Sequence, residues 1–300
     1  MFTIAHFSDV HLPPLPHASL GALMGKRLSG WLSWKLNRRK IHPPEVLASL
    51  MADIAAHQPD HLAFTGDLVN IALSREISRG REWLSQLASP RDLTMVPGNH
   101  DAYTAKAHEE LLHQFRPWME GDKPSPEIGS EIFPIVRYRR NIAIIGLSSA
   151  LATPVFQAWG KLGEAQIAKT AQILRHTREQ GFARIIMIHH PPLPGLAIAR
   201  KALQDAEAFS AMLQEEGAEL VLHGHNHLLE LHHSPGPNGQ IPCLGVPSAS
   251  ALAYTGHPAA AWAQISLRRK EGNWQITANI RQYHAEQNTM MAGPSWDLSQ

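Results

Sequence analysis

Short runs of apolar and β-branched residues recur along the chain, and turn-forming residues bound each run. Runs of this length and composition predict buried β-strands. The six clearest runs are FTIAHF (2–7), HLAFT (61–65), LTMVP (93–97), IAIIGL (142–147), RIIMIH (184–189) and ELVLHG (219–224).

Segments with helical periodicity separate several of these predicted strands. They begin at Glu45, Glu76, Ala107 and Glu164. In the last segment, Ile167, Ala171 and Leu174 fall on one face of a helix, and Gly181 is placed as its stop. Strands that alternate with helices predict layered α/β architecture.

After residue 225 the helical pattern disappears. Four runs joined by Gly and Pro turns read as strands: LLELHH, IPCLGV, AWAQISLR and WQITANIRQYH. We therefore expect the carboxyl-terminal third to build a second sheet. The polar residues 286–300 are expected to form a loose tail, which leaves one domain over residues 1–285 with an insertion at 13–44.

The composition is that of an ordinary globular protein, with 44% hydrophobic residues, 18% charged residues and a net charge of +1. No global field selects nucleic acid, so a duplex partner is not expected. Cys243 is the only cysteine, which excludes an internal disulfide and a cysteine-based zinc site. The absence of a long apolar run and of a leader pattern predicts a cytoplasmic location.

Nineteen histidines are the compositional oddity, and several lie in five short polar segments. Each segment directly follows a predicted strand: SDVH (8–11), GDLVN (66–70), GNHD (98–101), HHPP (189–192) and GHNH (224–227). Ligands in layered α/β proteins bind beyond the carboxyl ends of strands, so the segments are expected to converge. Their carboxylate, amide and imidazole groups suit divalent Mn, Fe or Zn.

In this order and spread, the five segments resemble those of the calcineurin-like metallophosphoesterase superfamily. The resemblance implies a four-layer αββα sandwich of two mixed β-sheets flanked by helices, with a dinuclear metal site at the strand ends. It assigns one metal ion to Asp9, His11, Asp67 and His227. It assigns the other to Asp67, Asn99, His189 and His225, with Asp67 bridging. His100 would be an acid or hydrogen-bond donor, oriented by Asp101.

Two cations about 3.5 to 4 Å apart can clamp a phosphoryl group and lower the pKa of water from about 15.7 toward 7. Hydroxide then becomes available at neutral pH and attacks phosphorus in line. His100 would stabilise or protonate the departing alkoxide. A phosphoester hydrolase is the function that these residues predict.

The motifs also bear on the substrate. GDLVN lacks the DRG continuation of calcineurin-like protein Ser/Thr phosphatases. The layout is most similar to bacterial class III cyclic nucleotide phosphodiesterases, so a small-molecule cyclic nucleotide is the leading substrate hypothesis. A metal-bound interaction protein without catalysis is a further alternative, although all ligand positions and His100 are present.

The insertion contains no acidic residue between His11 and Glu45, and it carries several basic ones. Apolar residues recur in it at near-helical spacing: Leu20, Met24, Leu28, Trp31 and Leu32. Basic residues beside tryptophan are typical of interfacial helices, so residues 20–40 could contact the inner membrane surface. The second hypothesis is therefore a lipid-linked phosphodiester or pyrophosphate hydrolase, resembling UDP-diacylglucosamine pyrophosphatases.

A lid over the site or a homodimer contact explains the same insertion and is favoured over membrane contact. Gly21, Gly25 and Gly30 weaken a helix there. Arg38 and Arg39 of the insertion, together with His190, are the predicted substrate-binding residues. His190 alternates away from His189 on an extended chain, which also fits a packing role.

Overall fold

The computed structural model describes residues 1–123 and 129–299. Two six-stranded sheets form its centre, in the orders β12-β11-β10-β1-β2-β3 and β4-β5-β6-β7-β9-β8. The strands are β1 (Phe2–Phe7), β2 (His61–Phe64), β3 (Leu93–Met95), β4 (Ile135–Arg139), β5 (Ile142–Gly146), β6 (Ala183–Met187), β7 (Leu220–His223), β8 (Glu230–Gly236), β9 (Gly239–Gly245), β10 (Ala261–Lys270), β11 (Asn273–His284) and β12 (Thr289–Asp297).

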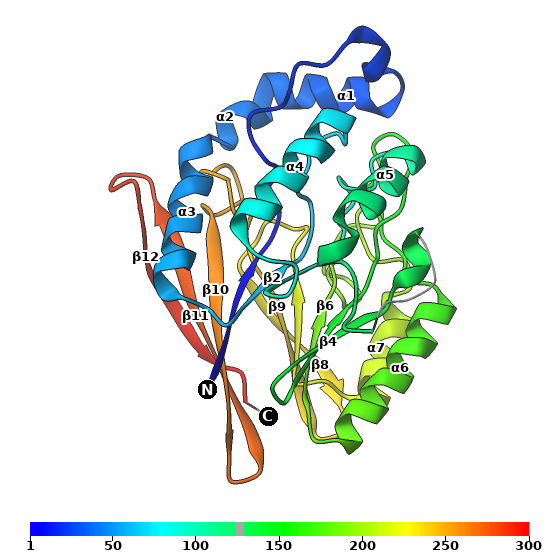
Figure 1. Ribbon diagram of the computed structural model, residues 1–300, viewed down its shortest axis with the longest axis vertical. Helices are drawn as coiled ribbons and strands as arrows, with labels where there is room; N and C mark the ends of the chain where they lie inside the picture. The colour runs from blue at the N-terminus through cyan, green and yellow to red at the C-terminus, as the bar shows by residue number, and fades with distance from the viewer. Residues whose placement is uncertain (124–128, 300) are drawn as a thin grey trace.

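Helices flank the two sheets (Figure 1). Helix α3 contacts β11 and β12 of the first sheet, whereas α6 and α7 contact β6 and β8 of the second. The helices are α1 (Lys26–Ser33), α2 (Arg39–Ile41), α3 (Pro44–His57), α4 (Ser74–Leu87), α5 (Ala105–Phe115), α6 (Glu164–Glu179) and α7 (Ala206–Glu216). A π-helix (Trp34–Arg38) joins α1 to α2, and short 3₁₀ turns are Leu20–Leu23, Arg116–Trp118 and Gly129–Ile132.

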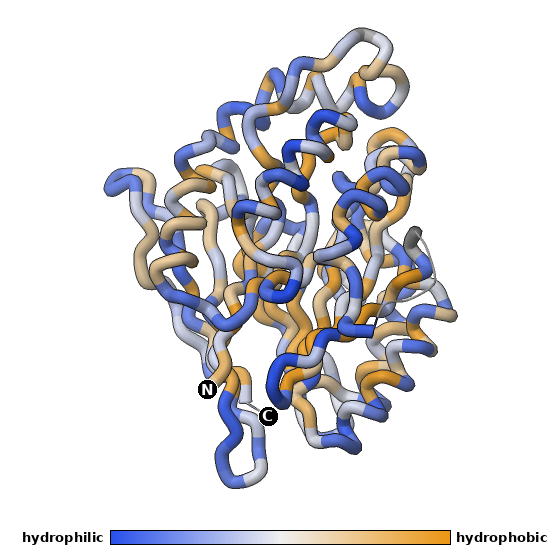
Figure 2. The backbone as a smooth tube through the Cα atoms, viewed as in Figure 1, coloured by the Kyte–Doolittle hydropathy of each residue, from blue (hydrophilic) through white to orange (hydrophobic). Residues whose placement is uncertain are grey.

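Both sheets are mixed. In the second sheet, β5, β6, β7 and β9 run parallel, and antiparallel β4 and β8 close its edges. Central strands covered on both faces are predominantly apolar, and all residues of β5 and β6 are buried, Arg184 included. Hydrophobic colour accordingly gathers along the strands in Figure 2. The predicted α/β sandwich of two mixed sheets flanked by helices is confirmed.

The carboxyl-terminal strands depart from the sequence prediction. They do not build a sheet of their own, because β8 and β9 extend the second sheet and β10 to β12 extend the first. β10 can do so because β1 leaves one edge open, and Phe2 pairs with Leu267 there. The predicted loose tail at 286–300 is wrong for β12, which pairs with β11 and buries Met290.

Part of the insertion forms a cap, defined here as residues 20–41, at the same end of the molecule as the strand-end loops (Figure 1). Its helix α1 is fixed to the domain by side chains. Lys26 Nζ donates to Gln157 O at 3.1 Å, and Arg27 Nη2 donates to Ala72 O at 2.6 Å. Gly30 lets this helix pack closely against Tyr103, because a Cβ added at Gly30 would lie 2.1 Å from the Tyr103 hydroxyl. Close packing therefore requires the glycine.

Candidate metal centre

The loops that follow β1, β2 and β7 bring one group of predicted ligands together. His227 Nε2 lies 3.1 Å from Asp9 Oδ1 and 3.3 Å from His11 Nε2. His11 Nε2 lies 4.0 Å from Asp67 Oδ2. Four side chains thus face one point, and each offers an oxygen or an imidazole nitrogen to it.

A second group forms on the other side of Asp67. His189 Nε2 lies 3.5 Å from Asp67 Oδ2 and 3.2 Å from Asn99 Oδ1. His225 Nδ1 lies 2.8 Å from Asn99 Oδ1. Asp67 is therefore adjacent to both groups, as the bridging position requires, and only His227 among the seven predicted ligands is more than slightly exposed.

Unusual backbone conformations accompany these ligands. Five of them have positive φ: Asp9 (53°), His11 (42°), Asp67 (60°), His225 (68°) and His227 (55°). Each such residue costs roughly 1–3 kcal/mol and persists at sites whose surroundings fix it. Gly98 adds a steric requirement, since an added Cβ would lie 2.2 Å from Asp67 Oδ1. The turns are thus built to place side chains.

Hydrogen bonds from outside the site orient three of the imidazoles. His189 Nδ1 donates to Thr65 O at 2.7 Å, and His11 Nδ1 contacts Val69 O at 3.3 Å. His227 Nδ1 pairs with the hydroxyl of Tyr254 at 3.2 Å. In each case the Nε2 atom is left to face the centre, which is how metal-binding histidines are fixed. The five strand-end motifs do not include Tyr254.

The electrostatics of the cluster fit a bound cation. Within residues 1–123 and 129–299, the ion-pair partners of Asp9 and Asp67 are histidines, with no Lys or Arg. Burial lowers the pKa of His189, but the nearby Asp67 and Asp9 carboxylates outweigh this effect and raise it to about 9. Buried carboxylates that draw positive charge, beside imidazole and amide groups, suit divalent transition metals.

His100 lies at the edge of the cluster. Its backbone N–H donates to Asp67 Oδ1 at 2.6 Å, and its Nδ1 pairs with the carbonyl of Asn70. Because a carbonyl only accepts, Nδ1 carries the proton in this pair. Arg38 Nη1 from the cap lies 3.5 Å from both ring nitrogens.

The predicted role of Asp101 is wrong, since its carboxylate does not bond to the His100 ring among the described contacts. It accepts backbone N–H groups from Asp67 (2.9 Å), Leu68 (2.9 Å), Val69 (3.2 Å) and Gly98 (2.9 Å). A side chain that follows His100 in a turn points elsewhere. Asp101 therefore fixes the loop that carries Asp67.

Of the three predicted substrate-binding residues, the structure brings Arg38 alone to the site. Arg39 is exposed and does not line the pocket beside His100. His190 is buried, with Nδ1 2.7 Å from Ser149 Oγ and Nε2 3.1 Å from Ala158 O. It packs the wall behind the ligands and does not face a substrate.

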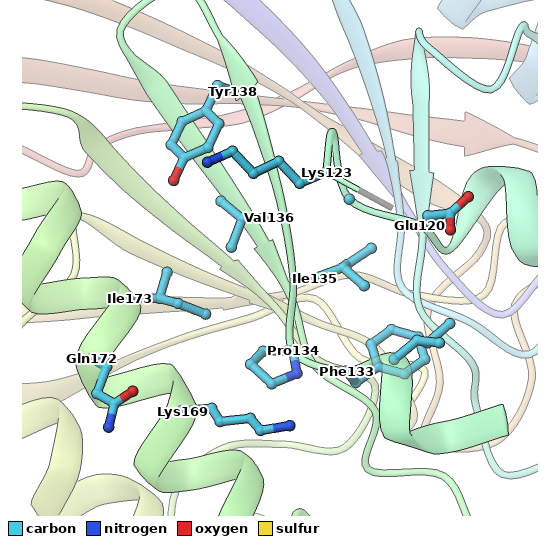
Figure 3. Close-up of a pocket in the computed structure, with 12 residues that line it drawn as sticks. Glu120, Lys123, Phe133, Pro134, Ile135, Val136, Tyr138, Lys169, Gln172 and Ile173 are labelled. Atoms are coloured by element: carbon cyan, nitrogen blue, oxygen red, sulfur yellow. The ribbon is translucent and has the colours of Figure 1, made fainter. Parts of the chain in front are cut away.

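Two cavities differ in their relation to this centre. One, of about 350 Å³, adjoins it and is lined by Asn99 and His100 together with Arg38 and Tyr103. The other, of about 340 Å³, lies between α6 and β4, where Lys169 and Tyr138 line it (Figure 3). None of the predicted metal ligands lines the second cavity.

Two mixed sheets with buried Asp and His side chains at the strand ends are typical of metal-dependent phosphoesterases. The chain belongs to the calcineurin-like phosphoesterase family, whose model matches residues 2–229. It is thus a phosphoesterase, with candidate ligands for the dinuclear divalent metal site that is typical of this family.

Solved structures with this fold include a dimetal phosphatase from Danio rerio (TM-score 0.63, 12% identity, covering 99% of this chain and 98% of that one). A purple acid phosphatase from yellow lupin (0.58, 11%, 99% and 53%) and the NAD nucleotidase of Haemophilus influenzae (0.54, 13%, 98% and 53%) are also similar. The chain spans about half of these two larger proteins. No curated protein sequence matches it. None of the described helices combines the length and apolar character needed to cross a bilayer.

Proposed function

We propose that this phosphoesterase cleaves a phosphodiester or pyrophosphate with two bound cations. Asp9, His11, Asp67 and His227 would hold one cation, and Asp67, Asn99, His189 and His225 the other. The observation that carries this assignment is the position of Asp67 between two groups of converging donor atoms. When bound, the cations would neutralise charge on the phosphoryl oxygens and supply hydroxide at neutral pH.

His100 is assigned to the departing oxygen. Its Nδ1–H donates to the carbonyl of Asn70, which leaves Nε2 as the nitrogen available to the adjoining pocket. When the ring is protonated at both nitrogens, Nε2 can donate a hydrogen bond or a proton there. A positioned donor of this kind contributes about 10²–10⁴-fold to the rate. Asp101 acts indirectly, through the loop that carries Asp67.

The cap supports a lipid-linked substrate met at a membrane surface. Met24, Leu28, Leu32 and Leu36 recur every fourth residue and are 78%, 48%, 44% and 67% exposed. We call these four residues the apolar stripe. Exposed basic side chains lie on the same cap: Lys35, Arg39 and Lys40. Exposed apolar residues among basic ones favour an anionic lipid surface or an acyl chain.

A cyclic nucleotide is the second candidate substrate. The pocket of about 350 Å³ beside His100 falls in the range of small-molecule sites, which supports it. A cyclic nucleotide would leave the apolar stripe without a function in substrate binding.

A paired turnover assay distinguishes the two candidates. Purified, manganese-loaded protein would be given cyclic AMP in water and a UDP-linked acylated sugar in detergent micelles, and kcat/KM measured for each. We expect preference for the glycolipid. Preference for the cyclic nucleotide would reverse this choice, and monoesters as the sole substrates of a broad panel would exclude both.

The membrane surface has a separate test. Leu28→Ser with Leu32→Ser should abolish co-sedimentation with anionic vesicles, whereas Met291→Ser on β12, a residue that is 39% exposed, should not. Binding that survives the cap variant would remove the apolar stripe from the proposal. A dimer in solution that the same variant separates would make the cap a homodimer contact instead.

A further inference from the structure

The pocket beside His100 is strongly basic. Four cationic side chains line it: Lys26, Arg38, Arg200 and Lys201. Its described lining contains no Asp or Glu. A pocket that also adjoins two divalent cations would hold far more positive charge than a single phosphodiester anion requires.

One of these four basic side chains, Lys26, already has hydrogen-bond partners. The ammonium of Lys26 donates to Thr153 Oγ1 (2.8 Å), Thr153 O (3.2 Å) and Gln157 O (3.1 Å), which uses its three protons. Lys26 therefore fixes the cap to the loop at 153–157. Its ammonium group has a structural role and is not free to bind a ligand.

The other three basic side chains have N–H groups available to donate hydrogen bonds. Among the described residues, the side chains of Arg200 and Lys201 form no hydrogen bond and no ion pair, and the guanidinium of Arg38 has hydrogen bonds to the His100 ring alone. Arginine presents a planar fork of donors that matches phosphate oxygens in pairs. An anionic group that enters this pocket would find these donors unpaired.

The loop that carries two of these cations is fixed by its backbone. The carbonyl of Arg200 accepts from the N–H of Ala158 at 2.8 Å, and the N–H of Gly160 donates to Ala202 O at 3.1 Å. The carbonyl of Ala158 also accepts from buried His190 at 3.1 Å. The backbone that positions Arg200 and Lys201 is thus ordered before a ligand arrives, which reduces the entropy lost on binding.

We propose that Arg38, Arg200 and Lys201 form a subsite for a second phosphate, on the leaving-group side of the scissile phosphorus. The side is set by Arg38, which lies 3.5 Å from the His100 ring at the departing oxygen. The substrate is then a diester of pyrophosphate, with a P–O–P linkage. This inference rests on the two-cation hydrolysis proposed above and narrows its substrate class.

The reaction that follows consumes only water. The oxygen of water bonds to the scissile phosphorus, and the bond from that phosphorus to the bridging oxygen breaks. Its electron pair stays on the bridging oxygen, which becomes part of the departing phosphate. Two phosphomonoesters result, and the two hydrogens of water end on them or, at neutral pH, in solvent. Arg38, Arg200 and Lys201 bind the charge of the departing phosphate.

Paired inhibitors test the subsite without a known substrate. Hydrolysis of bis(4-nitrophenyl) phosphate by the manganese-loaded chain would be inhibited with methylenediphosphonate, which carries two phosphonates, and with methylphosphonate, which carries one. Free Mn²⁺ is held constant. We expect methylenediphosphonate to bind about 10- to 100-fold more tightly, as hydrogen bonds between charged groups provide.

The variants are Arg38→Gln and the double change Arg200→Gln with Lys201→Gln. Each should reduce the advantage of methylenediphosphonate at least about tenfold. Arg39→Gln is the matched control, because Arg39 follows Arg38 in the cap but does not line the pocket, and it should keep the advantage. Melting temperatures confirm that each variant is folded.

An advantage that persists in both variants, or is absent in the wild type, would overturn the subsite while leaving two-cation hydrolysis in place. A manganese-loaded wild type that hydrolyses no phosphodiester and no pyrophosphate would instead overturn the proposed function, and the subsite with it.

Discussion

Asp101 Oδ2 accepts a hydrogen bond from the backbone N–H of Asp67 at 2.9 Å. The carboxylate of Asp101 therefore fixes the backbone that carries the predicted bridging ligand. Asp101→Asn replaces one acceptor oxygen by an amide NH₂ that faces backbone N–H groups. We expect metal affinity to fall about 10- to 100-fold, as for other residues that orient metal ligands. Metal titration followed by activity measures the change.

Asp205→Asn is the control for this variant, since Asp205 likewise accepts the backbone N–H groups of Leu162 (3.1 Å) and Gly163 (2.7 Å), but none of a predicted ligand. Equal metal affinity in both variants would contradict the role given to Asp101.

His100→Ala should lower turnover by about 10²–10⁴-fold while sparing metal content, because His100 donates to the departing group and is not among the seven assigned ligands. Metal content by elemental analysis and kcat would be measured together. His113→Ala, at an exposed position of α5, provides the control. Unchanged kcat in His100→Ala would reject the donor role.

Tyr254→Phe tests the orientation of His227 by removing the hydroxyl that lies 3.2 Å from Nδ1. The ring is then free to rotate, and we expect about tenfold weaker binding of one of the two metal ions. Stepwise metal titration would show one of two binding events shifted. Tyr138→Phe on β4 is the control. Equal metal affinities in the two variants would mean that the Tyr254 hydroxyl does not orient His227.

His61 should make folding stability sensitive to acid. Burial, with smaller contributions from Arg139 and Arg137, lowers its pKa to about 3, and its Nε2 pairs with Thr94 Oγ1 at 2.8 Å. His61 is neutral in the folded protein, whereas in the unfolded chain its pKa is near 6.5. Its contribution to the free energy of unfolding is therefore complete above pH 6.5. It is lost progressively as the pH falls toward 3.

Between pH 7 and 5 the wild type should lose about 2 kcal/mol more than His61→Gln, whose side chain does not titrate. Urea unfolding at both pH values measures the difference. Other buried histidines contribute equally to both proteins, so parallel losses would show that His61 does not titrate in this way.

The sequence predicted the parallel strands well because burial on both faces favours a continuous apolar run, as in β5. It missed β4, where Arg137 and Arg139 leave only a short apolar run. Arg137 is 3% exposed, and its guanidinium donates to the backbone carbonyls of Glu120 and Pro117 at 2.7 Å each. Carbonyls supplied by distant loops leave no trace in the local pattern.

The candidate site shows the same division. Asp9, Asn99 and His225 could be predicted because each lies in a polar turn directly after a strand. Tyr254 and Arg200 could not, since they reach the site through packing of loops that carry no local motif. The role of Asp101 was predicted wrongly because Asp101 follows His100 in the sequence, which suggested a contact between their side chains. In the turn, the Asp101 carboxylate instead accepts the backbone N–H of Asp67.

The pairing of Phe2 with Leu267 has a consequence for biosynthesis. The strand that leads into Asp9 leaves the ribosome long before its neighbour β10, because most of the domain lies between the two strands in the sequence. Throughout that interval β1 has an open edge, and open edges invite pairing with other chains. A nascent chain of this protein is therefore expected to need protection by chaperones until residue 270 has emerged.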